Sequence, residues 1–301
     1  VLSTKCRGII LEVSEGKLKR VIFQNELPVK LGEGGINDGY IAPAPFQRGV
    51  ETVQTIAELA NDHGAEQVTA IATSAVRSAR NGTAFIEAVH QKTGIQIQVI
   101  DGDREAELIY KGVKAVVEIK TTCLIMDIGG GSVEFIICDR NKVHWKRSYP
   151  IGAARLRERF HGTDPISTEE VIEMYHYLDE VLNELFQKCR IFKPEELIGS
   201  AGAFETFAEM ISHADDNVDY SADYVKLPSS SLLDLLATLS HSTGQQRASM
   251  PGLVAFRVDM IVVASLLTRY VLQKTAIAEV SLSRYSMKEG LLLDLAEELD
   301  R

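Results

Sequence analysis

The chain lacks several features that would place it in a common functional class. It has 32 Lys and Arg residues against 42 Asp and Glu residues, a formal net charge of −10, so the overall basic footprint of a nucleic-acid-binding protein is missing. The longest nearly uncharged apolar run, residues 260–267, is too short to span a bilayer, and no signal peptide is visible. We therefore expect a soluble globular protein whose 301 residues form about two domains.

Metal-binding and redox motifs are also missing. The seven histidines show no His-x-His or His-Glu-x-x-His spacing, and the four cysteines form no Cys-x-x-Cys pair, so we expect no zinc site. Cys123 and Cys138 fall in apolar stretches and are interpreted as small core residues. A reducing cytoplasm is the expected compartment.

Three frequent active-site motifs can be excluded. The chain contains no Gly-x-x-x-x-Gly-Lys-[Ser/Thr] P-loop and no Gly-x-Gly-x-x-Gly after a strand, which argues against a P-loop nucleotide site and a dinucleotide site. No serine occupies a Gly-x-Ser-x-Gly elbow, so the hydrolase fold built on that motif is not expected.

What the chain does contain is a repeated order of secondary structure. Hydrophobic periodicity predicts two α/β halves, each with the order βββαβαβα. In the first half we expect elements at residues 7–13, 17–23, 27–31, 43–61, 67–72, 83–91, 95–100 and 105–117. In the second half we expect strands at 123–128, 133–138 and 143–149, a long helix from a capping box at 167–170 to about 185, a strand at 196–198 and a helix at 204–211. A less regular insertion at 213–256, with one helix at 232–239, interrupts the order, which then continues with a helix at 257–272, a strand at 276–282 and a helix at 287–299. The prediction is therefore a duplicated α/β fold with domains at 1–120 and 121–301 and a cleft between them, the final helix, 286–301, being able to pack on the first domain.

A glycine stretch in the second half is the strongest candidate for chemistry. Gly129, Gly130 and Gly131, followed by Ser132, separate two apolar strands, and their N–H groups can line an anion-binding concavity. Asp127 and Glu134 lie on either side of this turn, and two hard oxygen donors next to a phosphate site suit Mg²⁺. A plain hairpin with one acid on each strand is the alternative.

Three further segments follow strands and open helices. Ser74 and Arg77 can contact phosphate, or can serve only as a helix start and a surface arginine. Glu105 can act as a general base for water, or can simply favour the helix N-terminus. Gly199 and Gly202 can form a second phosphate region or a close turn.

These segments together resemble the exopolyphosphatase/guanosine pentaphosphate phosphatase (Ppx/GppA) family. The resemblance rests on Ala72-Thr-Ser-Ala-Val-Arg77, Gly102-Asp-Arg-Glu-Ala-Glu-Leu-Ile-Tyr110, Asp127-Ile-Gly-Gly-Gly-Ser-Val-Glu134, Gly199-Ser-Ala-Gly202, and Pro251-Gly-Leu253 with Arg257-Val-Asp259. It covers almost the whole chain in the order of the family and matches the short, two-domain members.

The resemblance implies an actin-like (ribonuclease H-like) fold and hydrolysis of a terminal phosphoanhydride in inorganic polyphosphate or guanosine pentaphosphate. It implies Glu105 as the base, Asp127 and Glu134 as ligands of Mg²⁺ or another divalent cation, and Gly129 to Ser132 as the phosphoryl-binding loop, assisted by Ser74 and Arg77. No nucleic-acid polymer or membrane is expected as a partner, and a homodimer is plausible on general grounds.

One departure from the family pattern leaves alternatives open. Family members begin with an Asp-x-Gly-Ser/Thr-Asn turn, whereas the chain before Arg7 offers only Thr4 and Lys5 at the aligned positions, without the Asp and Gly. Either this loop is altered or residues are missing from the sequence. An altered loop would favour a catalytically weak sensor that binds guanosine polyphosphates or polyphosphate. A kinase of the same fold is a third possibility, which ADP formation with a co-substrate would reveal.

Overall fold

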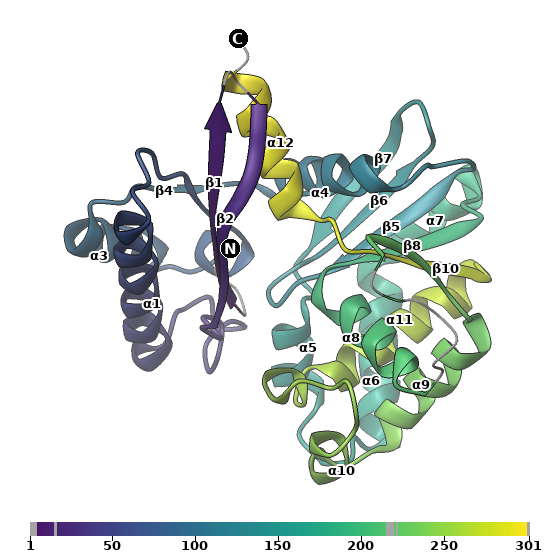
Figure 1. Cartoon of the computed structure of the whole chain (residues 1–301). Helices are drawn as coiled ribbons and strands as arrows, with labels where there is room; N and C mark the ends of the chain where they lie inside the picture. The colour runs from purple at the N-terminus through teal and green to yellow at the C-terminus, as the bar shows by residue number, and fades with distance from the viewer. Residues whose placement is uncertain (1–4, 15–16, 215–219, 221, 300–301) are drawn as a thin grey trace. The chain divides into compact units, whose positions relative to one another are not determined.

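The computed structural model describes residues 5–14, 17–214, 220 and 222–299 (Figure 1). The chain divides into two compact units. The first consists of the chain up to Glu105 together with the segment from Leu291 onward, and the second is Ala106–Gly290. Helix α4 (Gly102–Val116) begins in the first unit and continues into the second, and helix α12 (Met287–Leu299) begins in the second and continues into the first.

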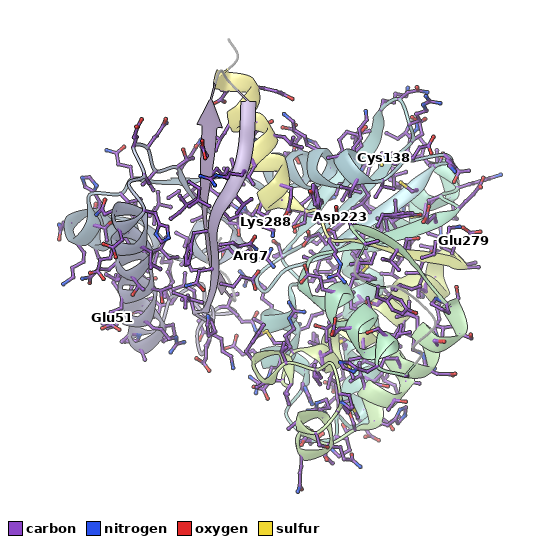
Figure 2. The ribbon with its side chains drawn as sticks, in the orientation of Figure 1. Arg7, Glu51, Cys138, Asp223, Glu279 and Lys288 are labelled. Carbon is purple, nitrogen blue, oxygen red and sulfur yellow. The ribbon has the colours of Figure 1, made fainter. Side chains whose placement is uncertain are left out.

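The first unit combines two strand pairs with helices of its own. Strands β1 (Lys5–Ser14) and β2 (Lys17–Pro28) form an antiparallel hairpin, in which Arg7, labelled in Figure 2, pairs with Glu26. Strands β3 (Ala70–Ala72) and β4 (Ile97–Val99) form a parallel pair. The helices are α1 (Pro43–Asp62), α2 (Ser74–Arg77) and α3 (Gly82–Thr93). Phe46 of α1 meets Phe85 of α3 edge to face, with ring centroids 5.3 Å apart.

The third strand predicted at residues 27–31 is wrong. Strand β2 continues to Pro28, and the chain then enters turns in which Lys30 has a positive φ of 47°. Proline has no N–H to donate to a neighbouring strand, and a left-handed residue cannot continue the extended backbone. The apolar signal at this point came from Val29 and Leu31, which are fully buried in the core of the first unit while belonging to a loop.

The second unit is built around one mixed sheet. Its strands are β5 (Cys123–Ile128), β6 (Val133–Cys138), β7 (Val143–Tyr149), β8 (Glu196–Ser200), β9 (Tyr224–Leu227) and β10 (Glu279–Ser283). Its helices, besides the parts of α4 and α12, are α5 (Ala153–Phe160), α6 (Thr168–Val181), α7 (Asn183–Phe192), α8 (Ala201–Ser212), α9 (Ser229–His241), α10 (Gly244–Ala248) and α11 (Ile261–Thr275), with a 3₁₀ turn at Ala255–Arg257.

The six strands of this sheet lie in the order β7-β6-β5-β8-β10-β9. Strands β5, β8 and β10 are parallel, whereas β6, β7 and β9 run antiparallel to their neighbours. One face, which includes Leu124, Met126 and Phe135, packs with residues of α5 to α9 and α11 into one large core. Because side chains alternate along a strand, Asp127 and Glu134 belong to the opposite face. Lys146 on that face pairs with Glu107 of α4.

Several boundaries in the second unit differ from the sequence prediction. The single long helix expected after the capping box ends at Val181, and α7 follows after Leu182. Strand β9 lies in the region expected to be irregular, and α5 was not predicted. The capping box itself is confirmed, since Ser167 accepts from the N–H of Glu170 and the Glu170 side chain accepts from the N–H of Ser167.

The cysteines are core residues, as predicted for two of them. All four are buried and unlinked, and Cys138, labelled in Figure 2, lies directly opposite Cys123 with 3.4 Å between the two Sγ atoms. Within the described ranges, the helices include none with the length and apolar character needed to cross a bilayer.

Candidate functional site

The glycine stretch forms the turn between β5 and β6, and it is held from one side by α5. The N–H of Gly129 donates to the carbonyl of Ser132 at 3.0 Å, which closes the turn. The first two N–H groups of α5, those of Ala153 and Ala154, donate to the carbonyls of Gly129 and Gly130, both at 2.9 Å. The α5 N-terminus, whose first N–H groups have no partner inside the helix, is thereby capped by the turn.

A third bond completes this support. Nε of Arg155 donates to the carbonyl of Gly131 at 2.9 Å. Three successive carbonyls of the turn therefore face α5. In a trans peptide the N–H points away from the C=O of the same unit, so the N–H groups of Gly130, Gly131 and Ser132 are directed away from α5. This is the arrangement that the sequence predicts for an anion-binding loop.

Asp127 and Glu134 lie opposite each other across this hairpin. They are register partners in the antiparallel pairing of β5 and β6, so their side chains share one face of the sheet. The pairing continues to Ser148 on β7 and to Ser200 on β8. Ser148 Oγ donates to Glu134 Oε1 at 2.6 Å, and Ser200 Oγ donates to Asp127 Oδ2 at 2.7 Å. The two acids thus belong to a polar row at the carboxyl end of the parallel strands, where α/β sheets usually bind ligands.

The chemistry of this row fits a hard divalent cation. Asp127 is 7% exposed and Glu134 is 1% exposed, and two like charges held opposite each other repel unless a cation lies near both. In the described part of the chain, no three His, Cys, Asp or Glu side chains are grouped closely enough to bind a metal. Two carboxylates with waters and phosphate oxygens in the other positions is the arrangement usual for Mg²⁺, which keeps much of its hydration shell.

The first unit brings together two of its three predicted site residues. Nη1 of Arg77 donates to Oε2 of Glu105 at 3.1 Å and to the carbonyl of Ile100 at 2.7 Å. Glu105 lies in the first turn of α4 and is 6% exposed. Ser74 is buried at the start of α2, three residues before Arg77 and hence on the same side of that turn. The guanidinium of Arg77 is therefore in direct contact with the buried carboxylate of Glu105.

Gly199 and Gly202 lie in close contact with neighbouring side chains of the second unit. A Cβ on Gly199 would lie 2.0 Å from the ring of Phe204, and a Cβ on Gly202 would lie 2.4 Å from Nη2 of Arg257. Arg257 donates to the carbonyl of Gly202 and to Thr206. These close contacts explain why glycine occupies both positions. The role in phosphate binding that the sequence predicts for the two glycines stays a prediction.

Three residues of this site are not among those predicted from the sequence, although one of them, Ser200, lies within the motif Gly199-Ser-Ala-Gly202. Ser148, Ser200 and Arg155 contact the predicted residues directly, yet each lies 14 to 73 positions away from its partner in the sequence. The contacts of the two serines depend on which residues pair across neighbouring strands. The contact of Arg155 depends on the packing of α5 against the turn. Neither arrangement can be read from a local sequence motif. Of the two residues aligned with the first loop of the family, Thr4 lies outside the described residues and Lys5 is described by its backbone alone.

Known proteins are similar to this chain over most of its length. The model of the Ppx/GppA phosphatase family matches residues 9–299. The chain belongs to the Ppx/GppA phosphatase family. Exopolyphosphatase 2 of Mycobacterium tuberculosis is 29% identical over 299 residues, covering 94% of this chain and 92% of its own. Exopolyphosphatase 1 of Mycobacterium bovis is 25% identical over 289 residues, covering 95% and 83%.

Solved structures of Ppx/GppA proteins show the same fold. A crystal structure of an exopolyphosphatase from Cytophaga hutchinsonii superposes with a TM-score of 0.90 and 35% identity, covering 96% of this chain and 94% of the other. The Aquifex aeolicus family member superposes with a TM-score of 0.78 at 23% identity, covering 99% and 96%, and supports the fold alone. The predicted actin-like α/β fold is therefore confirmed, and the chain is an exopolyphosphatase-like phosphatase.

Proposed function

We propose that this Ppx/GppA protein is an exopolyphosphatase that requires a divalent cation, with Mg²⁺ as the expected ion. Its substrate is inorganic polyphosphate, and guanosine pentaphosphate offers a terminal phosphoanhydride of the same chemistry. The observation that carries the proposal is the hairpin at residues 127–134, where two opposed carboxylates flank a turn whose N–H groups point away from α5. The names of the two mycobacterial relatives and of the Cytophaga structure favour polyphosphate.

In the proposed reaction, water attacks the terminal phosphorus, a new P–O bond forms, and the bridging P–O bond breaks. Glu105 takes a proton from the attacking water, and Arg77, which donates to Oε2 of Glu105, holds the carboxylate in position. The N–H groups of Gly130 to Ser132 bind the phosphoryl oxygens, so that the loop positions the phosphorus and stabilises its charge. The N–H of Gly129, predicted for the same role, donates to the carbonyl of Ser132 instead. Asp127 and Glu134 would hold the cation, which when bound neutralises phosphate charge.

The test measures phosphate release from polyphosphate and from guanosine pentaphosphate, with Mg²⁺ and after chelation. We expect release that depends on Mg²⁺, and a loss of about 10²- to 10⁴-fold in Glu105→Gln, the range usual for removal of a general base. Glu107→Gln is the matched control: it lies on the same helix, is largely exposed and pairs with Lys146, so its removal should change the rate little.

Each outcome has a defined meaning. Unchanged phosphate release in Glu105→Gln would remove that residue from the role of base. Absence of release from both substrates, together with binding detected by calorimetry, would instead favour the catalytically weak sensor. Release from guanosine pentaphosphate alone would correct the substrate. The homodimer and the cytoplasmic location expected from the sequence stay predictions.

A further inference from the structure

Two serines from different strands are bonded to the two acids of the hairpin. Ser148 of β7 donates to Glu134, and Ser200 of β8 donates to Asp127, through hydroxyl-to-oxygen distances of 2.6 and 2.7 Å. Such distances are typical of well-formed O–H···O bonds to a charged carboxylate, which are about twice as strong as neutral ones. The bonds lie on the outer sides of the acid pair, one on each side.

The fold itself sets the positions of these four residues. They are successive register partners across β7, β6, β5 and β8, so they share one face and stand in one row. A serine hydroxyl is separated from the backbone by one rotatable bond, and its position therefore follows that of the strand. The two serines therefore fix the orientation of the Glu134 and Asp127 carboxylates more firmly than long, flexible side chains could.

The bond between Ser200 and Asp127 replaces a capping bond that would stabilise the neighbouring helix, α8. It is the N-cap residue of α8, a position where serine usually accepts a bond from an N–H of the first helical turn. Its side chain makes no such capping bond, and its hydroxyl is directed to Asp127 instead. Ser200 is fully buried, so the hydroxyl that would cap α8 is instead fixed on the carboxylate.

An ionised carboxylate has two oxygens with about four lone-pair directions, and one serine bond does not exhaust its capacity to bind a cation. We propose that Ser148 and Ser200 are positioning residues that orient Glu134 and Asp127 for the divalent cation. The inference rests on the cation site of the proposed function. It adds two residues that hold the cation's ligands without binding the cation themselves. Their removal should weaken cation binding by about 10- to 100-fold, the range found when partners of metal ligands are lost.

Ser283 provides a matched control within the same row. It is the register partner of Ser200 on the next strand, β10, and is equally buried. Its hydroxyl donates to the carbonyl of Tyr285 at 2.8 Å, so its acceptor is a backbone group and not an acid. Ser283→Ala therefore removes a buried hydroxyl from the same edge of the sheet without changing the support of either carboxylate.

The experiment titrates the intact chain with Mn²⁺ and follows the loss of the electron paramagnetic resonance signal of the free ion. The set comprises the unsubstituted chain, Asp127→Asn, Ser148→Ala, Ser200→Ala, Ser148→Thr and Ser283→Ala. We expect dissociation constants about 10- to 100-fold higher in the two Ser→Ala variants, recovery in Ser148→Thr, which restores a hydroxyl on a partly exposed strand, and no change in Ser283→Ala. Circular dichroism without metal checks that each variant is folded.

The possible results distinguish the cation site at the hairpin from the positioning role of the two serines. If the unsubstituted chain and Asp127→Asn bind Mn²⁺ equally, the cation site at this hairpin is wrong, and the role of the serines fails with it. If Asp127→Asn loses Mn²⁺ while both Ser→Ala variants bind as the unsubstituted chain does, the cation site stands and the positioning role is overturned. Should Ser200→Ala fail to fold, Ser148→Ala and its threonine counterpart decide the question alone.

Discussion

Arg77 and Glu105 form a partly buried ion pair, with 3.1 Å between Nη1 of the arginine and Oε2 of the glutamate. The glutamate side chain is 8% exposed and the arginine side chain 26%. The sequence motifs predict separate roles for the two residues, Arg77 for phosphate and Glu105 for the attacking water. Their contact couples the two, because whatever displaces Arg77 also changes the surroundings of the proposed base.

We predict that Arg77→Met lowers the rate of phosphate release and lowers the free energy of unfolding by about 1–3 kcal/mol, because it leaves a buried carboxylate without its charged donor. Urea unfolding and phosphate release measure the two effects. In the double variant Arg77→Met with Glu105→Gln, the carboxylate charge is gone, so the loss of stability should be smaller than the sum of the single losses. Additive losses would contradict a direct interaction between the two side chains.

A second prediction concerns the acid stability of the second unit. Burial raises the pKa of Glu170, but bonds from Thr163, Ser167 and Gly162 outweigh it and lower the pKa from 4.5 to about 2. A carboxylate with a lowered pKa in the folded state stabilises the protein above its unfolded pKa. That contribution should be complete above about pH 4.5 and should be lost as the pH falls to about 2.

Glu170→Gln removes this titration, so the dependence of the unfolding free energy on pH between 4.5 and 2 should become shallower. Urea unfolding at a series of pH values measures the slope. Glu169→Gln is the control, because Glu169 precedes Glu170 in the same turn of α6 and receives none of these bonds. An equal decrease in slope for both variants would show that the capping network is not its source.

The sequence predicted the second unit well where a local pattern determines the structure. Strands β5, β6 and β7 begin and end as expected, because apolar stretches there are separated by glycine or by a polar turn. Helix α5 was missed because its eight residues carry three arginines and offer too short an apolar pattern. Its start depends on carbonyls of a turn more than twenty residues earlier, and no local pattern records such a contact.

Some residues of the candidate site could likewise be predicted from a local pattern, and others could not. Asp127, Glu134 and the glycines between them are close in sequence, so their joint presence in one hairpin could be predicted. The serine partners could not, because they depend on which strands are neighbours and in what register. The strand predicted at residues 27–31 is wrong for a related reason. Val29 and Leu31 are buried in a loop, and burial in a loop produces the same apolar sequence pattern as burial in a strand.

The last prediction tests whether close contact with α5 shapes the glycine turn. Gly152 precedes α5 with φ −59°, a value open to any residue, so only space restricts this position. A Cβ there would lie 2.4 Å from the carbonyl carbon and oxygen of Gly130 and 2.5 Å from the carbonyl carbon of Gly131. These are backbone atoms, which cannot rotate away as a flexible side chain can. Gly152→Ala must therefore displace either the turn or the start of α5.

We expect Gly152→Ala to lower the unfolding free energy by about 1–3 kcal/mol, as overpacking usually does, and to decrease phosphate release by at least about tenfold. The loss of activity should persist at temperatures where the variant is fully folded, because the N–H groups of the turn are then held in the wrong place. Gly162→Ala is the control, since a Cβ there would meet only the end of the Glu170 side chain, at 3.1 Å. A Gly152→Ala protein with normal phosphate release would show that the turn does not need the support of α5 to act on phosphate.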